Sequence, residues 1–198
     1  MTTPDPREPS VRRAVPADRD RVIATVVAAF VDDPAFRYFF PDDATYAGHA
    51  AAFAGYLFDK RVRHGSVWLV EGGASVSLWD SPDAPESSSA LNLPPDVLAR
   101  LDAYENAVHG SMPTEPHWYL GVLATHPDHA GKRWGRAAIA AGAAEADSEG
   151  LPAYLETTNP ANVELYGRTG FVVDTQLLAD PPRLGIPVWI MRRAPRKT

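Results

Sequence analysis

Four side chains that can carry positive charge lie close together in the middle of this 198-residue sequence: His129, Lys132, Arg133 and Arg136. The whole chain has a formal net charge of -6, so this cluster runs against the overall balance. A local basic cluster in an acidic protein indicates one particular anion rather than an extended polyanion surface. Guanidinium and ammonium groups suit phosphate oxygens. The alternative is a solvated helix face that binds nothing.

The elements around the cluster favour an anion site. Residues 118–124 form a short run rich in aromatic and aliphatic side chains, which predicts a buried strand, and Pro127 ends it. From Gly131 onward small and apolar residues recur at helical spacing as far as Gly150. The first turn of that helix has free N–H groups and a positive dipole end, so it attracts phosphate. We therefore predict an anion-binding loop for a large phosphorylated cofactor.

Two common phosphate loops are excluded, because the chain has neither G-x-x-x-x-G-K-[ST] nor G-x-G-x-x-G after a strand. The stretch instead resembles the signature of the GNAT superfamily of N-acetyltransferases, in which a strand leads into Gln/Arg-x-x-Gly-x-Gly/Ala. Residues 130–135 occupy that frame, with Ala130 in place of Gln or Arg and Arg133 in place of the middle glycine. A second segment, Leu155 to Phe171, resembles the family's strand, Asn-containing helix start and Tyr-x-x-x-Gly-Phe ending.

The resemblance implies a mixed α/β (α+β) fold with a mostly antiparallel central sheet, flanked by helices, whose splayed strand pair binds acetyl-CoA. Backbone groups of the strand would hold the pantetheine arm, and the loop would take the pyrophosphate. The implied cofactor-binding residues are Leu123, Ala124, Thr125, Ala130, Gly131, Lys132, Arg133, Trp134, Gly135, Arg136, Asn162 and Tyr166. An arginine at 133 can contact phosphate directly, where the family has a glycine.

The resemblance also implies the catalytic residues. Tyr166 matches a tyrosine that acts as general acid toward the departing thiolate in many family members. For the general base the candidates are Glu156, His117, Asp33 or a water relay. Glu156 lies in the strand expected beside the cofactor strand, so we assign it the base or substrate-orienting role. Capping or ion pairing is the alternative for Glu156.

The acceptor amine is expected at the segment DDPAFRYFFP, residues 32–41. Aromatic walls and carboxylates suit an aromatic or apolar amine by stacking its body and pairing its cation. We assign acceptor binding to Phe30, Asp33, Phe36, Tyr38 and His117. The alternative is that the aromatic side chains fill the core while the two aspartates cap helices.

Composition bounds the remaining possibilities. With 45% hydrophobic residues, the chain has enough for a sizeable core, so we expect one acetyltransferase domain over residues 10–198 after a flexible tail, residues 1–9. There is no cysteine and no metal-like ligand spacing, so disulfides, a cysteine nucleophile and a metal site are not expected. No signal peptide, membrane span or long basic run is present, which predicts a cytoplasmic protein without a nucleic-acid or membrane partner. The sequence is compatible with a homodimer.

Further elements follow from local patterns. A strand is expected at 11–15, a helix from Pro16 to about residue 31, long helices over 43–63 and 95–108, and a loop over 80–92. Two strands flank Gly72-Gly73 as a two-residue hairpin. After the cofactor helix come a strand at 153–157, a helix from Asn159 to Gly170, and a final antiparallel pair at 172–178 and 186–191.

The interpretation of the sequence is an N-acetyltransferase that moves the acetyl group of acetyl-CoA directly to a primary amine of a small molecule, antibiotic-like or a metabolite. One alternative keeps the chemistry and makes the acceptor a protein or peptide amine. The second is a non-catalytic acyl-CoA-binding domain, prompted by the departures at Ala130 and Arg133.

Overall fold

A single twisted sheet of seven strands, in the order β1-β2-β3-β4-β5-β7-β6, organises the chain. The computed structural model describes residues 8–84, 90–177 and 184–196. Every neighbouring pair of strands is antiparallel except β4 and β5, which run parallel. The strands are β1 (Val11–Arg13), β2 (Val67–Val70), β3 (Ser75–Asp80), β4 (Trp118–Thr125), β5 (Ala153–Thr157), β6 (Val172–Leu177) and β7 (Val188–Arg193).

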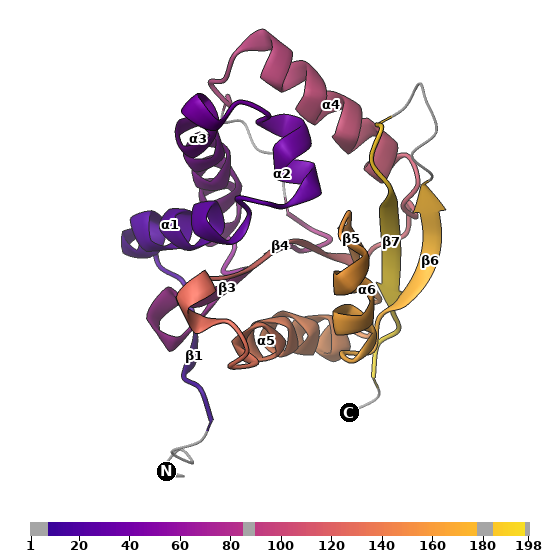
Figure 1. The fold of residues 1–198 in the computed structure, drawn as a ribbon. Coiled ribbons are helices and arrows are strands. Elements are labelled where there is room, and N and C mark those ends of the chain that lie inside the picture. The colour runs from indigo at the N-terminus through magenta and orange to yellow at the C-terminus, as the bar shows by residue number, and fades with distance from the viewer. Residues whose placement is uncertain (1–7, 85–89, 178–183, 197–198) are drawn as a thin grey trace.

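Helices cover both faces of this sheet (Figure 1). The α-helices are α1 (Arg19–Ala29), α2 (Pro34–Phe39), α3 (Asp43–Val62), α4 (Pro95–His109), α5 (Trp134–Glu149) and α6 (Pro160–Gly167). Short 3-10 turns lie at η1 (Pro16–Asp18), η2 (Glu71–Gly73) and η3 (Pro127–His129). Helix α5 packs on one face of β2, β3 and β4, and α1 and α3 pack on the other. No helix of the described residues is long and apolar enough to cross a membrane.

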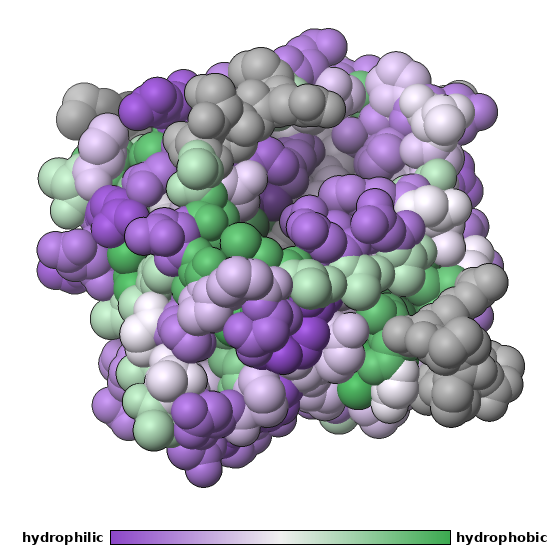
Figure 2. Space-filling model, turned by 90° about the horizontal axis from the view of Figure 1, so that it is seen from above, coloured by the Kyte–Doolittle hydropathy of each residue, from purple (hydrophilic) through white to green (hydrophobic). Residues whose placement is uncertain are grey.

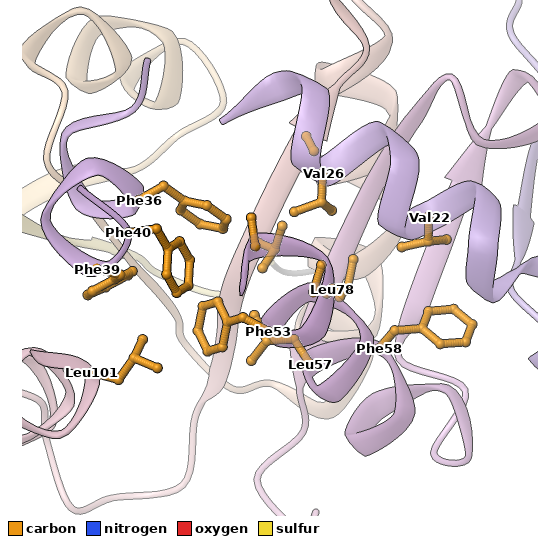
Figure 3. Packing of buried hydrophobic residues seen from close by; sticks show 14 of the residues in the cluster. Val22, Val26, Phe36, Phe39, Phe40, Phe53, Leu57, Phe58, Leu78 and Leu101 are labelled. Carbon is orange, nitrogen blue, oxygen red and sulfur yellow. The ribbon is translucent and has the colours of Figure 1, made fainter. Parts of the chain in front are cut away.

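The larger core lies between the sheet and α1 to α4. Three phenylalanines of the α2 segment, Phe36, Phe39 and Phe40, pack around Phe53 of α3 with ring centroids 5.9 to 6.0 Å from it (Figure 3). All four are at most 8% exposed. Most of the aromatic cluster predicted as a candidate acceptor site therefore serves the core, as the alternative reading had it.

The second core lies under α5 and depends on a close approach of that helix to the sheet. Trp79 of β3 is fully buried against Gly142 of α5, where a Cβ atom would lie 2.2 Å from the indole. Ser77 of β3 donates a hydrogen bond of 2.8 Å to the carbonyl of Ala138. The small residues of α5 thus let this helix sit close to the sheet, which fixes where its N-terminus points.

Strands β4 and β5 separate halfway along their length. Their parallel pairing runs from Trp118 and Ala153 to Leu120 and Leu155 and goes no further. Beyond it β4 pairs only with β3, and the register shift between those two strands leaves Gly121 as a bulge. Half of β4 therefore has one edge without a partner strand. This is the predicted splayed strand pair.

Most predicted elements are confirmed, and three differ. The aromatic segment forms the short helix α2, which the sequence analysis did not predict. Pro34 is the first residue of α2, a position where the missing N–H has no partner to lose. The connection at Gly72-Gly73 is not a two-residue hairpin, since residues 71–74 separate the paired strands. Helix α5 begins at Trp134, later than Gly131.

Some expectations fall on residues outside the described ranges. These are most of the tail at 1–9, the middle of the loop at 80–92 and the connection between the last two strands.

Candidate active site

A groove of about 710 Å³ lies between the N-terminus of α5, the free edge of β4 and helix α6. We call it the groove. It is lined by Ala29, Phe30, Asp32, Asp33, Leu123, Thr125, His129, Ala130, Gly131, Arg133, Trp134, Gly135, Arg136, Asn159, Ala161, Asn162, Glu164, Leu165, Tyr166 and Arg168. Ten of the twelve residues predicted from sequence to bind the cofactor line this groove.

The free edge of β4 presents backbone groups to the groove. Ser75 Oγ donates to the carbonyl of Ala124, and the amide of His126 donates to Ala74, so residues 124 and 126 point their backbone toward β3. Alternate residues of a strand point the other way, so Leu123 and Thr125 turn theirs toward the gap between β4 and β5. Both also line the groove with their side chains. An extended amide-bearing ligand can pair with these groups as a strand would.

In the loop before α5, residue 133 has a backbone conformation that is typical of glycine, although it is an arginine. Arg133 has φ 61° and ψ 17°, the left-handed conformation, directly before the first helical residue. That conformation costs a side-chain-bearing residue roughly 1–2 kcal/mol. Arg133 is exposed and lines the groove with Arg136. The substitution therefore preserves the loop's path and adds a guanidinium beside the helix N-terminus.

Two predicted cofactor residues are not brought to the groove. Ala124 is 1% exposed, and its side chain belongs to the core under α1 and α3. Lys132 turns its ammonium over the ring of Trp134, 4.6 Å from the centroid, with His129 Nδ1 at 3.3 Å. Trp134 and His129 do line the groove, so Lys132 supports its wall from outside.

A second space, which we call the inner cavity, opens from the groove into the sheet. Its volume is about 150 Å³, close to that of a cavity able to enclose benzene. Eight aromatic side chains line it: Phe30, Phe36, Phe39, Phe53, Tyr56, Tyr104, Tyr119 and Tyr166. Viewed from above the orientation of Figure 1, the surface is hollowed near its centre, with hydrophobic residues gathered beside the hollow (Figure 2).

Glu156 brings a carboxylate into this aromatic space. It lies at the end of β5, beyond the last residue paired with β4, and it is half-buried. The hydroxyl of Tyr119 donates a hydrogen bond to Glu156 Oε2. Burial raises the pKa of Glu156 to about 7, with the Tyr119 hydrogen bond and the charge of Arg61 acting in the opposite direction. A carboxylate with that pKa can exchange a proton near neutral pH.

Tyr166 stands where the two spaces meet. It belongs to α6, lines both the groove and the inner cavity, and is 7% exposed. Burial raises the pKa of its phenol well above the usual value, and the charge of Glu156 adds to the effect. The phenol therefore remains a proton donor throughout the physiological range. Asn162, one turn earlier, also lines both spaces and donates weakly to Thr157 Oγ1 at 3.5 Å.

Asp33 serves two purposes. Its Oδ1 accepts hydrogen bonds from the amides of Ala35 and Phe36 at 2.9 and 3.2 Å, so it caps α2. It also lines both the groove and the inner cavity, as Phe30 does, and burial raises its pKa. The capping role that the sequence left open is present, and the side chain still faces the place where the two spaces join.

Two predicted acceptor residues lie away from the inner cavity. Tyr38 of α2 is half-buried and packs on Phe39 with centroids 5.8 Å apart. His117, just before β4, hydrogen-bonds through Nδ1 to the carbonyl of Glu115 at 2.8 Å and packs on Tyr154. Only Phe30, Asp33 and Phe36 of the predicted five line the inner cavity.

The sequence reading missed several residues of the inner cavity. Tyr119 was read as one more apolar strand residue, although alternation along β4 points it opposite to its buried neighbours Trp118 and Leu120. Tyr104 comes from a helix with no chemical motif, and burial raises its pKa well above the usual value. Arg61 and Asp80 are separated by 19 residues and meet only in the fold.

Comparison with known proteins agrees with this geometry. Residues 91–171 match the model of the acetyltransferase (GNAT) family. A solved structure from Corynebacterium glutamicum, described as histone acetyltransferase HPA2 and related acetyltransferase, is 25% identical, has a TM-score of 0.70, and aligns over 96% of this chain and 98% of its own.

Two structures of lower identity share the fold. The polyamine N-acetyltransferase of Drosophila melanogaster, described as forming N-acetylagmatine, is 13% identical with a TM-score of 0.69, over 94% of this chain and 100% of its own. The arylalkylamine N-acetyltransferase 2 of Aedes aegypti is 12% identical with a TM-score of 0.62, over 96% and 100%. In fold, and in sequence over residues 91–171, this chain is therefore similar to the GNAT acetyltransferases.

Proposed function

We propose that this protein transfers the acetyl group of acetyl-CoA to a primary amine of a small molecule, antibiotic-like or a metabolite. One observation carries the proposal: the basic groove and the aromatic inner cavity meet at a common wall. Five residues line both spaces: Phe30, Asp33, Leu123, Asn162 and Tyr166. A long ligand in the groove and a small one in the inner cavity would bring their ends together there.

The groove has the chemistry that coenzyme A requires. Its phosphates would lie at the N-terminus of α5, where free N–H groups, Arg133 and Arg136 converge. The amides of the pantetheine arm would pair with the backbone of Leu123 and Thr125 along the free edge of β4. When bound, acetyl-CoA supplies the acetyl group and a thiol as leaving group.

The chain's own residues would manage the protons. An amine must be neutral to attack, so Glu156 would accept its proton from within the inner cavity. A new N–C bond forms as the S–C bond of the thioester breaks, and Tyr166 would donate a proton to the departing sulfur. The surrounding aromatic side chains would exclude water and so protect the thioester from hydrolysis.

The inner cavity supports an amine with an aromatic or apolar body. Its walls are aromatic, and Glu156 and Asp33 offer carboxylates to a cation. Related structures include enzymes named for polyamines and arylalkylamines, which fits a small amine here. The sequence also resembles puromycin N-acetyltransferase at three short segments, which are Pro127-Asp128-His129, the Leu-Glu-Thr at 155–157, and the Trp-x-Met-x-Arg ending at 189–193. Puromycin is therefore one acceptor to test.

The experiment combines calorimetry with acetyl-CoA and free-thiol release across a panel of amines that includes puromycin, an arylalkylamine, a polyamine and a lysine-containing peptide. We expect acetyl-CoA to bind with micromolar affinity, about -8 kcal/mol, and at least one small amine to drive thiol release. Turnover with the peptide alone would transfer the proposal to peptide amines. Binding without turnover by any amine would reduce the protein to an acyl-CoA-binding domain.

A further inference from the structure

We propose that Arg61 is a positioning residue whose guanidinium, held by Asp80 and admitted beside the active site by Gly121, sets the proton affinity of Glu156. The inference rests on the proposed function, in which Glu156 accepts the amine proton. Nothing in the GNAT signature segments predicts it, because Arg61 lies in the last turn of α3, far from both segments in sequence.

The guanidinium is fixed in place by two elements. The side chain of Arg61 is 4% exposed and forms an ion pair with Asp80 of β3, whose side chain is 19% exposed. Arg61 Nη1 also donates to the carbonyl of Leu57 at 3.2 Å. On the other side of Asp80, Lys60 Nζ lies 3.2 Å from Oδ1. Arg61 therefore cannot swing to solvent as a surface arginine does.

Gly121 makes room for this guanidinium at the bulge of β4. A Cβ atom at position 121 would lie 2.7 Å from Arg61 Nη2 and 3.3 Å from Cε1 of Tyr119. The guanidinium and the Tyr119 ring thus lie on the same side of Gly121. Because the hydroxyl of Tyr119 holds Glu156, the positive charge lies next to the hydrogen-bonded pair that the proposed chemistry uses.

Several charged and titratable groups face Glu156, and their effects differ in sign. Tyr119 comes from β4, Tyr104 from α4, Tyr166 from α6, and Asp33 from the start of α2. The same inner cavity is also lined by Glu105, His109, Lys60 and Asp80. Burial is the largest effect and raises the pKa of Glu156, the charge of Asp33 raises it further, and the charge of Arg61 lowers it.

A buried ion pair contributes little net stability, because the cost of desolvating two charges offsets their attraction. Replacing such a pair with apolar residues of similar volume is often neutral or stabilising. Here the pair borders the one carboxylate that would have to lose a proton near neutral pH. A neighbouring cation prevents burial from driving the proton affinity of that carboxylate too high for the role.

The test measures the Glu156 titration in the full-length protein by carbon-13 NMR, with the Glu156→Gln spectrum identifying the signal. Arg61→Met removes the cation and should raise the midpoint by roughly half to one pH unit, while Asp80→Asn leaves the cation unopposed and should lower it by a similar amount. Arg61→Lys should stay near the wild-type midpoint. Asp59→Asn, which removes the Arg19 partner on the same helix, is the matched control and should change nothing.

Opposite shifts in the first two variants support the proposal, because a merely structural pair would change stability without moving the midpoint in opposite directions. Equal midpoints in the wild type, Arg61→Met and Asp80→Asn would overturn it. If Arg61→Met does not fold, Gly121→Ala provides the second variant. It displaces the guanidinium and should raise the midpoint of the Glu156 titration. An unchanged midpoint in this variant would also overturn the proposal.

The titration does not depend on turnover. Absence of acetyl transfer in the amine panel would contradict the proposed function, whereas the NMR titration would still test the effect of Arg61 on Glu156.

Discussion

Glu156 is a carboxylate held in an aromatic space, and its protonation couples to the stability of the fold. Its pKa is about 7 in the folded protein against an ordinary value of 4.5. The folded state therefore binds this proton more tightly than the unfolded state does. The contribution of the protonated Glu156 carboxyl to the free energy of unfolding is fully present below pH 4.5 and is lost as the pH rises through 7.

Glu156→Gln should remove that loss, because the amide keeps an acceptor for Tyr119 without a charge. The difference of 2.5 pH units corresponds to at most about 3 kcal/mol. We expect the variant to gain stability relative to the wild type between pH 5 and pH 8, as measured by the midpoint of thermal unfolding. A difference between the two proteins that stays constant over that range would show that the carboxyl titrates normally.

Tyr166 is the other residue with a distinct chemical role. Tyr166→Phe keeps the ring in the wall that joins the groove and the inner cavity and removes only the hydroxyl. We expect turnover to fall about a hundredfold or more, as loss of a general acid does, with the calorimetric affinity for acetyl-CoA unchanged. Full activity in this variant would remove the general-acid assignment.

At the scale of the element, the turn before α5 determines which groups would contact the phosphates of the cofactor. Arg133→Gly relieves the left-handed strain and should raise the free energy of unfolding by about 1 kcal/mol. It also removes a guanidinium from the groove, so acetyl-CoA affinity should fall, most clearly at low salt. Chemical denaturation and calorimetry on the same variant measure the two effects separately.

Lys132→Ala is the matched control, because Lys132 is adjacent in sequence but turns its ammonium onto Trp134 instead of lining the groove. Its effect on acetyl-CoA affinity should be smaller than that of Arg133→Gly. Equal losses would mean that the groove responds to net charge alone and that Arg133 has no specific contact.

Helix α2 depends on a single cap. Asp33→Ala should destabilise the protein by about 1 kcal/mol, whereas Asp33→Asn keeps an acceptor for the amides of Ala35 and Phe36. Both variants remove the negative charge from the inner cavity and should raise KM for a cationic amine in steady-state kinetics. If Asp33→Asn restores stability and KM together, Asp33 is only a cap.

At the scale of the whole molecule, local signals predicted the elements and left much of the inner cavity unseen. Strand and helix periodicity predicted β4 and α3 nearly to the residue, because each pattern is set by near neighbours, whereas the predicted start of α5 was three residues early. Arg61, Tyr104 and Tyr119 reach the inner cavity from three separate elements, and no single-sequence pattern links them. His117 shows the opposite limit of local sequence: it is adjacent to β4 in the chain, yet it packs on Tyr154 and does not line the inner cavity.

The central claim is that Glu156 removes the proton from an amine bound in the inner cavity. It is tested most directly by the pH dependence of kcat/KM for the best amine in the wild type and in Glu156→Gln, because ionisation of the free amine is common to both and cancels in their ratio. We predict a ratio that rises with pH to a plateau, with a midpoint near 7. A ratio that does not change with pH would contradict the account.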